Sequence, residues 1–319
     1  MAKTFNLLLP TRADRVITIS GGLVRMAKLS DEYYVPVGDP AVVIDALAAT
    51  KADIFTFPQD IGDNTARYKF HQEWDNLAVL PLTTYEDWLS KQIRFKARNK
   101  LKKALKSGME IRLIEFEDKL VRQVMDVYNE SPIRQGQRNF HYGKDFDTTK
   151  REHGEYLDRS VFIGAFINDR LIGFAKVVHA SGCSHLMKIV SMVSQRDKAP
   201  NNALVAKAIE ICAGRKVPYL AYSVWGKRPG LNEFKAANGF IRLDVPRYFV
   251  PLSCKGRVLL HWKLHRPFKD YLPEKWVIAA GDMRARWTRF RYRNFVVAAG
   301  ASQDRFDSAQ PNELAGRGG

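Results

Sequence analysis

Between residues 110 and 250, the apolar side chains switch between two spacings in a regular order. Alternating apolar residues predict strands, and apolar residues three and four positions apart predict helices. The resulting order is strand, helix, helix, three strands, helix, strand, helix and strand. Successive strands form antiparallel pairs, whereas a strand–helix–strand connection makes two strands parallel. This order predicts an α/β (α+β) protein with a mixed, mostly antiparallel sheet flanked by helices.

The ranges of these elements can be stated from the same spacings. Strands are expected at 110–116, 161–167, 171–179, 186–193, 219–224 and 240–250, and helices at 120–128, 148–157, 203–213 and 231–237. Asn168-Asp169-Arg170 predicts a hairpin turn. Earlier in the chain we expect strands at 15–19, 23–29, 54–57 and 77–82, a helix at 41–50, a loop between 57 and 77, and a basic helix at 91–107.

The composition is that of a globular protein. Of the 319 residues, 45% are hydrophobic, and no apolar run approaches the roughly 18–20 residues that cross a bilayer. The first residues form too short an apolar stretch for a signal peptide. The three cysteines, Cys183, Cys212 and Cys254, are widely spaced without a Cys-x-x-Cys pair, so we expect reduced thiols. These features predict a cytoplasmic protein.

The net charge of +17 is concentrated in two segments. Residues 91–122 hold 11 Lys and Arg against four acids, and residues 255–293 hold 11 against three. Such clusters suit a polyanionic partner: phosphate, nucleic acid or an acidic membrane surface. The basic helix could follow a nucleic-acid backbone or be a solvated face. Aromatic residues among the cations of 255–293 favour peripheral attachment to the inner membrane face, with packing on the main domain as the alternative.

Two stretches resemble the GNAT-like acyltransferase fold, and specifically its Fem-type branch. The residues from Gly230-Leu231 through Phe234-Lys235 to Gly239-Phe240 are similar to the Gly-Leu-x-x-Phe-Lys … Gly-Phe signature of Fem-type transferases. The strand at 186–193, the loop at 194–202 and the helix that follows resemble the family's central strand, pyrophosphate loop and next helix. The resemblance covers residues 84–252.

The resemblance implies a division of the chain into four parts. Residues 84–254 would be a GNAT/Fem-like acyltransferase domain that the basic helix at 91–107 leads into. By analogy with the family, residues 1–83 would be a degenerate GNAT-like half. Residues 255–297 form the basic aromatic segment, and 298–319, rich in Gly, Ser, Asn and Gln, are expected to be a disordered tail.

The loop at 194–202 departs from the pattern of acetyl-CoA-dependent members because it contains no glycine. Glycines permit close backbone approach to a pyrophosphate. The loop still opens a helix, whose first amides attract anions. Fem-type members that use aminoacyl-tRNA also lack these glycines, so the departure favours that branch.

The resemblance assigns the central strand and this loop to the acyl donor. A strand amide would hold the acyl carbonyl, and the side chains and amides of the loop would contact phosphate. The residues assigned in this way are Ile189, Val190, Ser191, Met192, Val193, Gln195, Arg196, Lys198, Asn201 and Asn202.

Three further assignments concern the reacting groups. The resemblance places Lys235 in the substrate cleft near phosphate or the reacting carbonyl, with Phe234 shaping the pocket; the alternative is a solvated lysine on a short helix. Tyr222 and Tyr248 lie on strands expected to end near the cleft, where a phenol could protonate a leaving group, or they are packed aromatics.

The polar loop at 129–143, and especially the stretch at 128–138, is a further candidate, because long polar loops in compact domains often bind substrate. Glu130 is a candidate base for the acceptor amine, or a carboxylate that faces water. Arg134 and Arg138 could hold an anionic group, and Gln135, His141 and Tyr142 extend the same polar surface. His179 and His185 flank a turn without a nearby carboxylate, so no metal site is expected.

Together these features predict an N-acyltransferase that joins an acyl group to an amine by direct attack, because no Ser-His-Asp or Cys-His arrangement stands out. The expected donor is an acyl-CoA, acetyl-CoA or longer, and the acceptor an amine of a small, lipid-linked or polysaccharide-precursor molecule. Two alternatives stay open: transfer from aminoacyl-tRNA, and a non-catalytic module that binds nucleic acid or an anionic membrane. The sequence leaves the oligomeric state open.

Overall fold

The structure is a computed structural model. It describes residues 3–9, 12–62, 65–134, 137–226 and 229–266, with the single positions 283, 287 and 290, and it describes side chains from Arg15 onward. The chain divides into two units, one made of Met1–Val127 and Asp145–Pro267 and the other of Tyr128–Lys144 and Phe268–Gly319. Within the described residues, none of the helices combines the length and apolar character that crossing a bilayer requires.

The first unit is built on one mixed sheet, whose eleven described strands follow the order β1-β2-β3-β4-β13-β5-β12-β11-β10-β9-β6. The strands are β1 (Lys3–Leu9), β2 (Arg12–Ser20), β3 (Met26–Leu29), β4 (Ile54–Pro58), β5 (His71–Pro81), β6 (Glu110–Ile114), β9 (Ser160–Ile167), β10 (Arg170–Ala180), β11 (Cys183–Ser191), β12 (Tyr219–Val224) and β13 (Ile241–Pro251). The pairs β3–β4 and β11–β12 are parallel, and the other described pairs of this sheet are antiparallel. The predicted fold class is confirmed.

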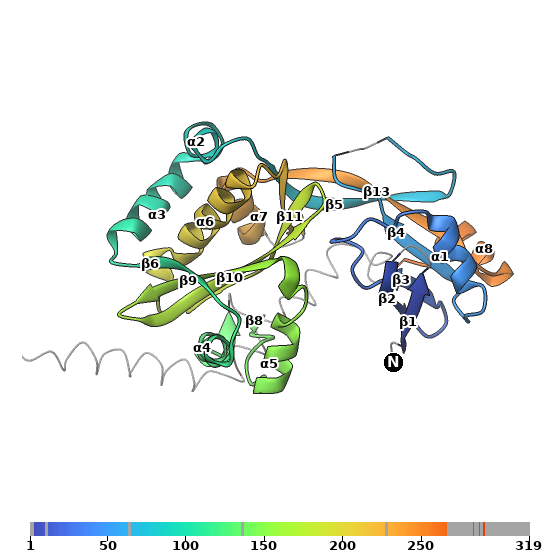
Figure 1. Ribbon diagram of the computed structural model, residues 1–319, viewed down its shortest axis with the longest axis horizontal. Helices are drawn as coiled ribbons and strands as arrows, with labels where there is room; N and C mark the ends of the chain where they lie inside the picture. The colour runs from blue at the N-terminus through green and yellow to red at the C-terminus, as the bar shows by residue number, and fades with distance from the viewer. Residues whose placement is uncertain are drawn as a thin grey trace, which may run out of the picture. The chain divides into compact units, whose positions relative to one another are not determined.

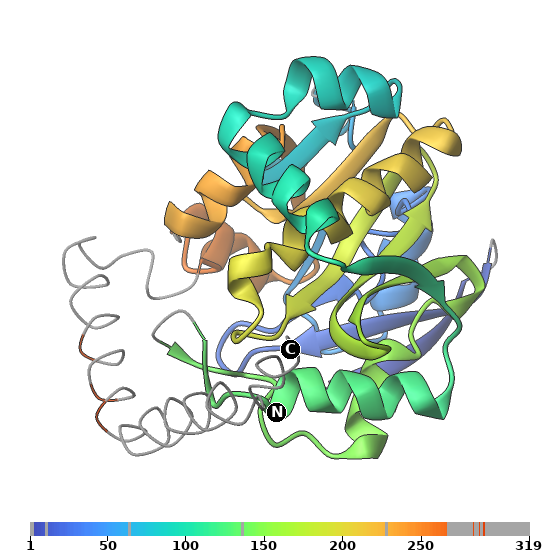
Figure 2. The ribbon, with the colours of Figure 1, turned by 90° about the vertical axis from the view of Figure 1, so that its left-hand side faces the viewer.

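Helices cover both faces of the part of the sheet made by β6, β9, β10 and β11. The helices of the first unit are α1 (Pro40–Leu47), α2 (Tyr85–Asp87), the π-helical turn η1 (Trp88–Gln92), α3 (Phe95–Lys106), α4 (Asp118–Asn129, whose last two residues belong to the second unit), α5 (Phe146–His153), α6 (Pro200–Gly214), α7 (Pro229–Ala237) and α8 (Cys254–His261). The nearly all-buried helix α6 packs on β9, β10 and β11, and α3 packs on α6. Helices α4 and α5 lie on the opposite face (Figures 1 and 2).

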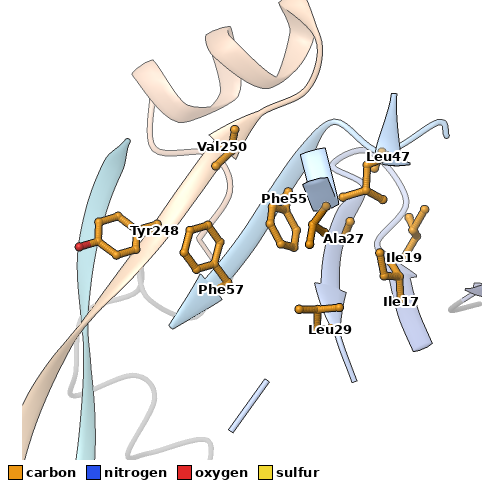
Figure 3. Packing of buried hydrophobic residues seen from close by; sticks show 11 residues of the cluster. Ile17, Ile19, Ala27, Leu29, Leu47, Phe55, Phe57, Tyr248 and Val250 are labelled. Carbon is orange, nitrogen blue, oxygen red and sulfur yellow. The ribbon is translucent and has the colours of Figure 1, made fainter. Parts of the chain in front are cut away.

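The N-terminal strands enclose a core of their own. Figure 3 shows Phe55 and Phe57 of β4 packed among Leu29, Leu47 and Val250. Val250 belongs to β13, which pairs with β5 along its first part and with β4 along its last part. The pairing with β4 brings Val250 to this core. One sheet therefore runs through both sides of the expected boundary at 83/84, and the division into a degenerate half and a second domain stays a prediction.

Most elements lie where the spacings place them, and the differences have local causes. The predicted hairpin at Asn168-Asp169 is present, with both residues at positive φ. The basic helix begins at Phe95 instead of 91, because Ile93 and Arg94 are extended after the π-helical turn. His71, expected in a loop, begins β5. The helix expected at 148–157 ends at His153.

Three further boundaries differ. Strand β11 begins at Cys183 and ends at Ser191 instead of spanning 186–193. Helix α1 ends at Leu47, three residues before its expected end. Of the basic aromatic segment 255–297, the structure describes the residues to Arg266 and three isolated positions, and the expected disordered tail at 298–319 lies outside the described residues.

Candidate functional site

The central feature is the way in which β11 and β12 diverge. These parallel strands pair at two positions, Ser184 with Leu220 and His185 with Ala221, where their described ladder ends. Strand β12 continues along β5 through a register shift between Ala221 and Val224. Ser223, inside that shift, has a φ of 54°. We call the divergence of β11 from β12 beyond His185 the splay.

An irregularity on the other side of β11 accompanies the splay. In the ladder with β10, Lys188 pairs with Lys176 and Leu186 with Val177, so Met187 is an extra residue on β11. Such a β-bulge bends its strand, increases the local twist and is frequent beside active sites. The bulge thus gives a physical reason for β11 to leave its parallel neighbour at this point.

The pairing register shows which backbone groups of β11 point toward the splay. The N–H of Met192 donates to the carbonyl of Ile172 on the β10 side at 2.7 Å. Backbone groups of successive residues in an antiparallel ladder alternate between the two edges of a strand. The amide of Ile189, three positions away, therefore points toward β12, and its contact with an acyl carbonyl stays a prediction. The amide of Met192 is used by β10, which corrects its assignment to the acyl group.

The loop after β11 ends in a tight turn that starts α6. Ala199 has a φ of 55°, and Pro200 is the first residue of the helix. Arg196 is exposed, and the Lys198 ammonium donates to Gln195 Oε1 at 2.7 Å. These three side chains lie close together before the start of the helix. Their contact with phosphate stays a prediction, as do the roles of Val190, Ser191, Val193 and Asn201.

Asn202 was expected to offer its amide to phosphate, and the structure corrects this. Its N–H donates to the carbonyl of Ala199 at 3.0 Å, inside the turn. Its buried side chain donates to Asn238 Oδ1 at 3.4 Å. The amide of Asn202 thus closes the turn at the start of α6, and its side chain joins α6 to the end of α7.

Lys235 is fully buried on the last turn of α7, beside β12. Its ammonium donates to the carbonyl of Val224 at 2.7 Å and lies 4.7 Å from the ring centroid of Tyr222. Burial lowers the pKa of Lys235 to about 8, because the charged form is poorly solvated there. Burial also raises the pKa of Tyr222. Lys235 and Tyr222, which the sequence assigns separately to the neighbourhood of the cleft, are thus in contact, and their roles stay predictions. The solvated alternative for Lys235 is excluded because the side chain is buried.

The rest of the Phe-Lys … Gly-Phe stretch holds α7 in place. Trp88 Nε1 donates to the carbonyl of Asn238 at 2.9 Å. The Asn238 side chain donates to the carbonyl of Phe234 at 2.7 Å. Gly239 has a φ of 90°, and a Cβ there would lie 3.2 Å from Gln92 Cβ. The position of Lys235 therefore depends on a glycine turn packed against the π-helical turn.

The chain resembles known proteins through its structure. No family model matches the chain, and no curated protein gives a significant match. Among solved structures, L-PGS from Bacillus licheniformis is 11% identical over 83% of this chain and 90% of that chain, with a TM-score of 0.51. The chain has a GNAT-like fold.

Two further solved structures give lower scores. The C-terminal domain of a protein assigned as a lysylphosphatidylglycerol synthetase from Agrobacterium fabrum is 14% identical over 77% of this chain and 84% of that chain, with a TM-score of 0.49. FemX is 9% identical over 82% of this chain and 90% of that chain, with a TM-score of 0.48. At these identities the likeness concerns the fold alone.

Tyr248 does not lie beside Lys235 in this GNAT-like sheet. Its strand, β13, pairs at this position with both β4 and β5, and the ring of Tyr248 packs 5.3 Å from that of Phe57 on β4 (Figure 3). Its hydroxyl donates to Gln59 Oε1 at 2.6 Å and accepts from the Arg67 N–H at 2.8 Å. The assignment of Tyr248 to the reacting group is corrected, because it is a buried residue of the N-terminal core.

The second unit contains the polar loop at 128–144, which has its own internal order. Asn139 is buried and donates to the carbonyls of Tyr128 at 2.8 Å and Ser131 at 2.9 Å. The ring of His141 stacks on that of Tyr128 at 4.3 Å. Asn139, which the sequence reasoning missed, organises the loop; its signal is an Asn within a run of turn residues.

The loop also forms a short hairpin, β7 (Ile133–Arg134) with β8 (Gln137–Arg138). Gln135 lies outside the described residues. The substrate roles of Arg134, Arg138, His141 and Tyr142 and the basic role of Glu130 stay predictions.

Four histidines of the first unit lie in two different environments. His179 bonds to Ser184 Oγ at 2.7 Å, and the His185 ring lies 5.1 Å from that of Tyr34. Burial lowers the pKa of both to about 4, so both are neutral at pH 7. Elsewhere in the described chain, potential ligand atoms of His71, Glu73 and His265 lie within 4.8 Å of one another.

That second group is already an ion-paired cluster. Glu73 Oε1 accepts from His265 Nε2 at 2.8 Å and pairs with the Arg266 guanidinium at 3.0 Å. A guanidinium at this distance opposes the binding of a further cation.

Two adjoining hollows lie near the start of β11. One, of about 210 Å³, is lined by residues that include Gly38, Gln59 and Tyr68. The other shares Gln59 and Asp60 with it and reaches Cys183 and His185. They lie toward the opposite end of β11 from Ser191 and the phosphate-loop residues.

Proposed function

We propose that the protein is an N-acyltransferase that moves an acyl or aminoacyl group to an amine by direct attack at the splay. The observation that carries this proposal is the buried Lys235 beside β12, with a pKa lowered to about 8 by burial. A buried titratable group with a strongly shifted pKa marks a candidate functional site. Lys235 contacts Tyr222 and Val224, in the part of β12 that follows the splay. This is the place where the proposal puts the substrate.

The chemistry assigns a role to each part. The acyl carbonyl accepts from the Ile189 amide, which stabilises the oxyanion that forms when the amine nitrogen attacks the carbonyl carbon. The tetrahedral intermediate then collapses as the bond to the donor's sulfur or oxygen breaks. Lys235, mostly protonated at neutral pH, donates its proton to that leaving atom. The nitrogen that attacked then releases its extra proton to the neutral Lys235 amine, which leaves an amide product and a protonated lysine. The exposed Arg196 and the half-buried Lys198 hold the donor's phosphates.

The leading donor is an acyl-CoA. A second donor, an aminoacyl-tRNA, is favoured by one specific observation: the basic helix α3 contacts the turn at Arg196–Lys198. The exposed cations of this helix and its start are Arg94, Lys96, Lys100, Lys102, Lys103 and Lys106. They would extend the cation set of the loop along a nucleic-acid backbone. When the donor is an ester, the leaving group is an alkoxide, which needs a proton more than a thiolate does. Lys235 would therefore contribute more to turnover with aminoacyl-tRNA than with acyl-CoA.

Donor binding is tested by unfolding the full chain with acetyl-CoA or with tRNA. A ligand at 100 times its dissociation constant adds about 2.7 kcal/mol of stability. We expect stabilisation by acetyl-CoA that is lost in R196A/K198A, because these side chains lie at the loop. Stabilisation by tRNA alone, lost in K102E/K103E, would replace the coenzyme A donor with the ester donor.

Turnover is tested with Lys235→Met. The matched control is Lys176→Met, because Lys176 on β10 is also fully buried, with a pKa lowered by burial to about 8. Its ammonium donates to the carbonyls of His153 and Glu155, away from β12. We expect K235M to lose at least about a hundredfold in turnover with the donor still bound, and K176M to retain it. Equal activity in the two variants would contradict the role of Lys235 and leave the non-catalytic module.

A further inference from the structure

Helix α8 has an inner face that is part of the N-terminal core. Leu259 and Leu260 pack on Ile54 and Phe249, together with the partly buried Val24 and Met26. Ser253 caps the start of this helix, because its hydroxyl accepts from the Gly256 N–H at 3.0 Å. A Cβ at Gly256 would lie 2.0 Å from the Asp53 carbonyl oxygen, so the helix backbone lies directly on the sheet. This packing fixes which side chains of α8 face outward.

The outward side chains include large apolar groups. Val258 is 56% exposed, Trp262 67% and Leu264 53%, and Leu23 in the loop between β2 and β3 is 81% exposed. Val258 and Trp262 are four residues apart and so share a helix face. The Lys255 ammonium donates to the carbonyl of Leu23, which joins that loop to α8. We call these four residues the α8 patch.

The groups around the α8 patch are mainly cationic. Arg257 is exposed on α8, and Lys28 is exposed on the same face of β3 as Met26, which packs against this core. The carboxylate of Asp53 touches this region but is held inward. Burial alone would raise the pKa of Asp53, but hydrogen bonds from Arg25 and the charge of Lys255 lower it. The outward field of this surface is therefore positive.

We propose that the α8 patch docks the protein on an anionic lipid bilayer. An exposed Trp with aliphatic neighbours enters the boundary between headgroups and acyl chains, while flanking cations meet lipid phosphates. A nucleic acid would use the cations but would leave the aliphatic side chains of Leu23, Val258 and Leu264 in water. The apolar content of the patch therefore favours lipid. This docking goes beyond the transfer reaction and does not depend on it.

The test is sedimentation of the full chain with vesicles of phosphatidylcholine, alone or with phosphatidylglycerol. We expect binding that requires phosphatidylglycerol and weakens with salt. The apolar variant W262A/L264S should bind at least about tenfold more weakly. The charge variant K28E/R257E should bind at least about 30-fold more weakly, since each cation lost near the surface contributes about a factor of five and the two new carboxylates repel the lipid phosphates. All of these side chains are exposed, and thermal unfolding checks that the variants stay folded.

Matched controls come from α3, which also carries exposed apolar and cationic side chains. Phe95 is 77% exposed and Leu105 64%, and the controls are F95A/L105S and K102E/K103E. Both should keep wild-type vesicle binding. Three outcomes would overturn the proposal: no binding to phosphatidylglycerol vesicles, equal losses in the α3 and α8 variants, or binding that W262A/L264S leaves unchanged. The last outcome would assign attachment to residues 267–319, which all these variants retain.

Discussion

The buried ammonium of Lys235 makes a quantitative prediction about the pH dependence of stability. Its pKa is about 8 in the folded chain and about 10.4 in an unfolded chain. Between these values the unfolded state binds a proton that the folded state has released, so stability rises with pH. Below pH 8 both states are protonated, and the destabilisation caused by the buried charge is fully present. Lys235 thus destabilises the fold most at neutral and lower pH.

Replacing Lys235 with Met removes this dependence without removing the aliphatic part of the side chain. From pH 7.5 to 9.5, these two pKa values give the wild type a gain of about 2 kcal/mol relative to K235M. Urea unfolding gives the difference in stability between wild type and K235M at each pH. The change in that difference between the two pH values isolates Lys235, because the other titrating groups are common to both proteins. Below pH 8 the buried charge destabilises the wild type, and this charge contribution favours K235M as the more stable protein.

The same experiment on Lys176 provides an internal standard. Its pKa is also lowered to about 8 by burial, so K176M should show a similar dependence. Lys207, on the surface and paired with Glu210 at 2.8 Å, is the negative control. A difference between K235M and wild type that is the same at pH 7.5 and 9.5 would refute the burial argument. It would also remove the main support for a functional lysine at the splay.

Three further predictions concern other parts of the chain. Arg247 is buried and bonded to Glu32 Oε1 at 3.0 Å, so R247M should cost about 3–5 kcal/mol in urea unfolding, whereas the exposed R242M should change stability by less than about 0.5 kcal/mol. N139A removes the two donors that organise residues 128–144, so limited proteolysis should cut this loop faster while urea unfolding of the first unit stays unchanged. If Lys235 protonates the leaving group, kcat should fall as pH rises through about 8, and a profile that only rises would count against that role.

The sequence predicts those features of the fold whose causes are local. The hairpin at Asn168-Asp169 is an example, since both residues tolerate positive φ and sit between two strand patterns. Lys235 was found because it belongs to a short signature, and its contact with Val224 comes from a residue only 11 positions away. The fold class followed in the same way, from the order of neighbouring elements.

The features that were missed depend on partners far away in the sequence. Tyr248 was misplaced because the last part of β13 pairs with β4 of the N-terminal core as well as with β5, and nothing in its apolar pattern records the pairing with β4. Asn202 was assigned to the loop because the sequence does not show that the fold brings its side-chain partner, Asn238, next to it. The start of α3 depends on Trp88, whose bond to Asn238 spans 150 residues.

The route of β13 has a consequence for how the protein is made. Pro251 pairs with Ile54, so the N-terminal sheet lacks its last strand until residue 251 has left the ribosome. At about 5–20 residues per second, that strand follows β4 by roughly 10–40 seconds. During this time the nascent chain carries the edge of β4 and the apolar ring of Phe57 without the strand that covers them in Figure 3. Synthesis of the middle of the chain therefore sets the earliest time at which its beginning can finish folding.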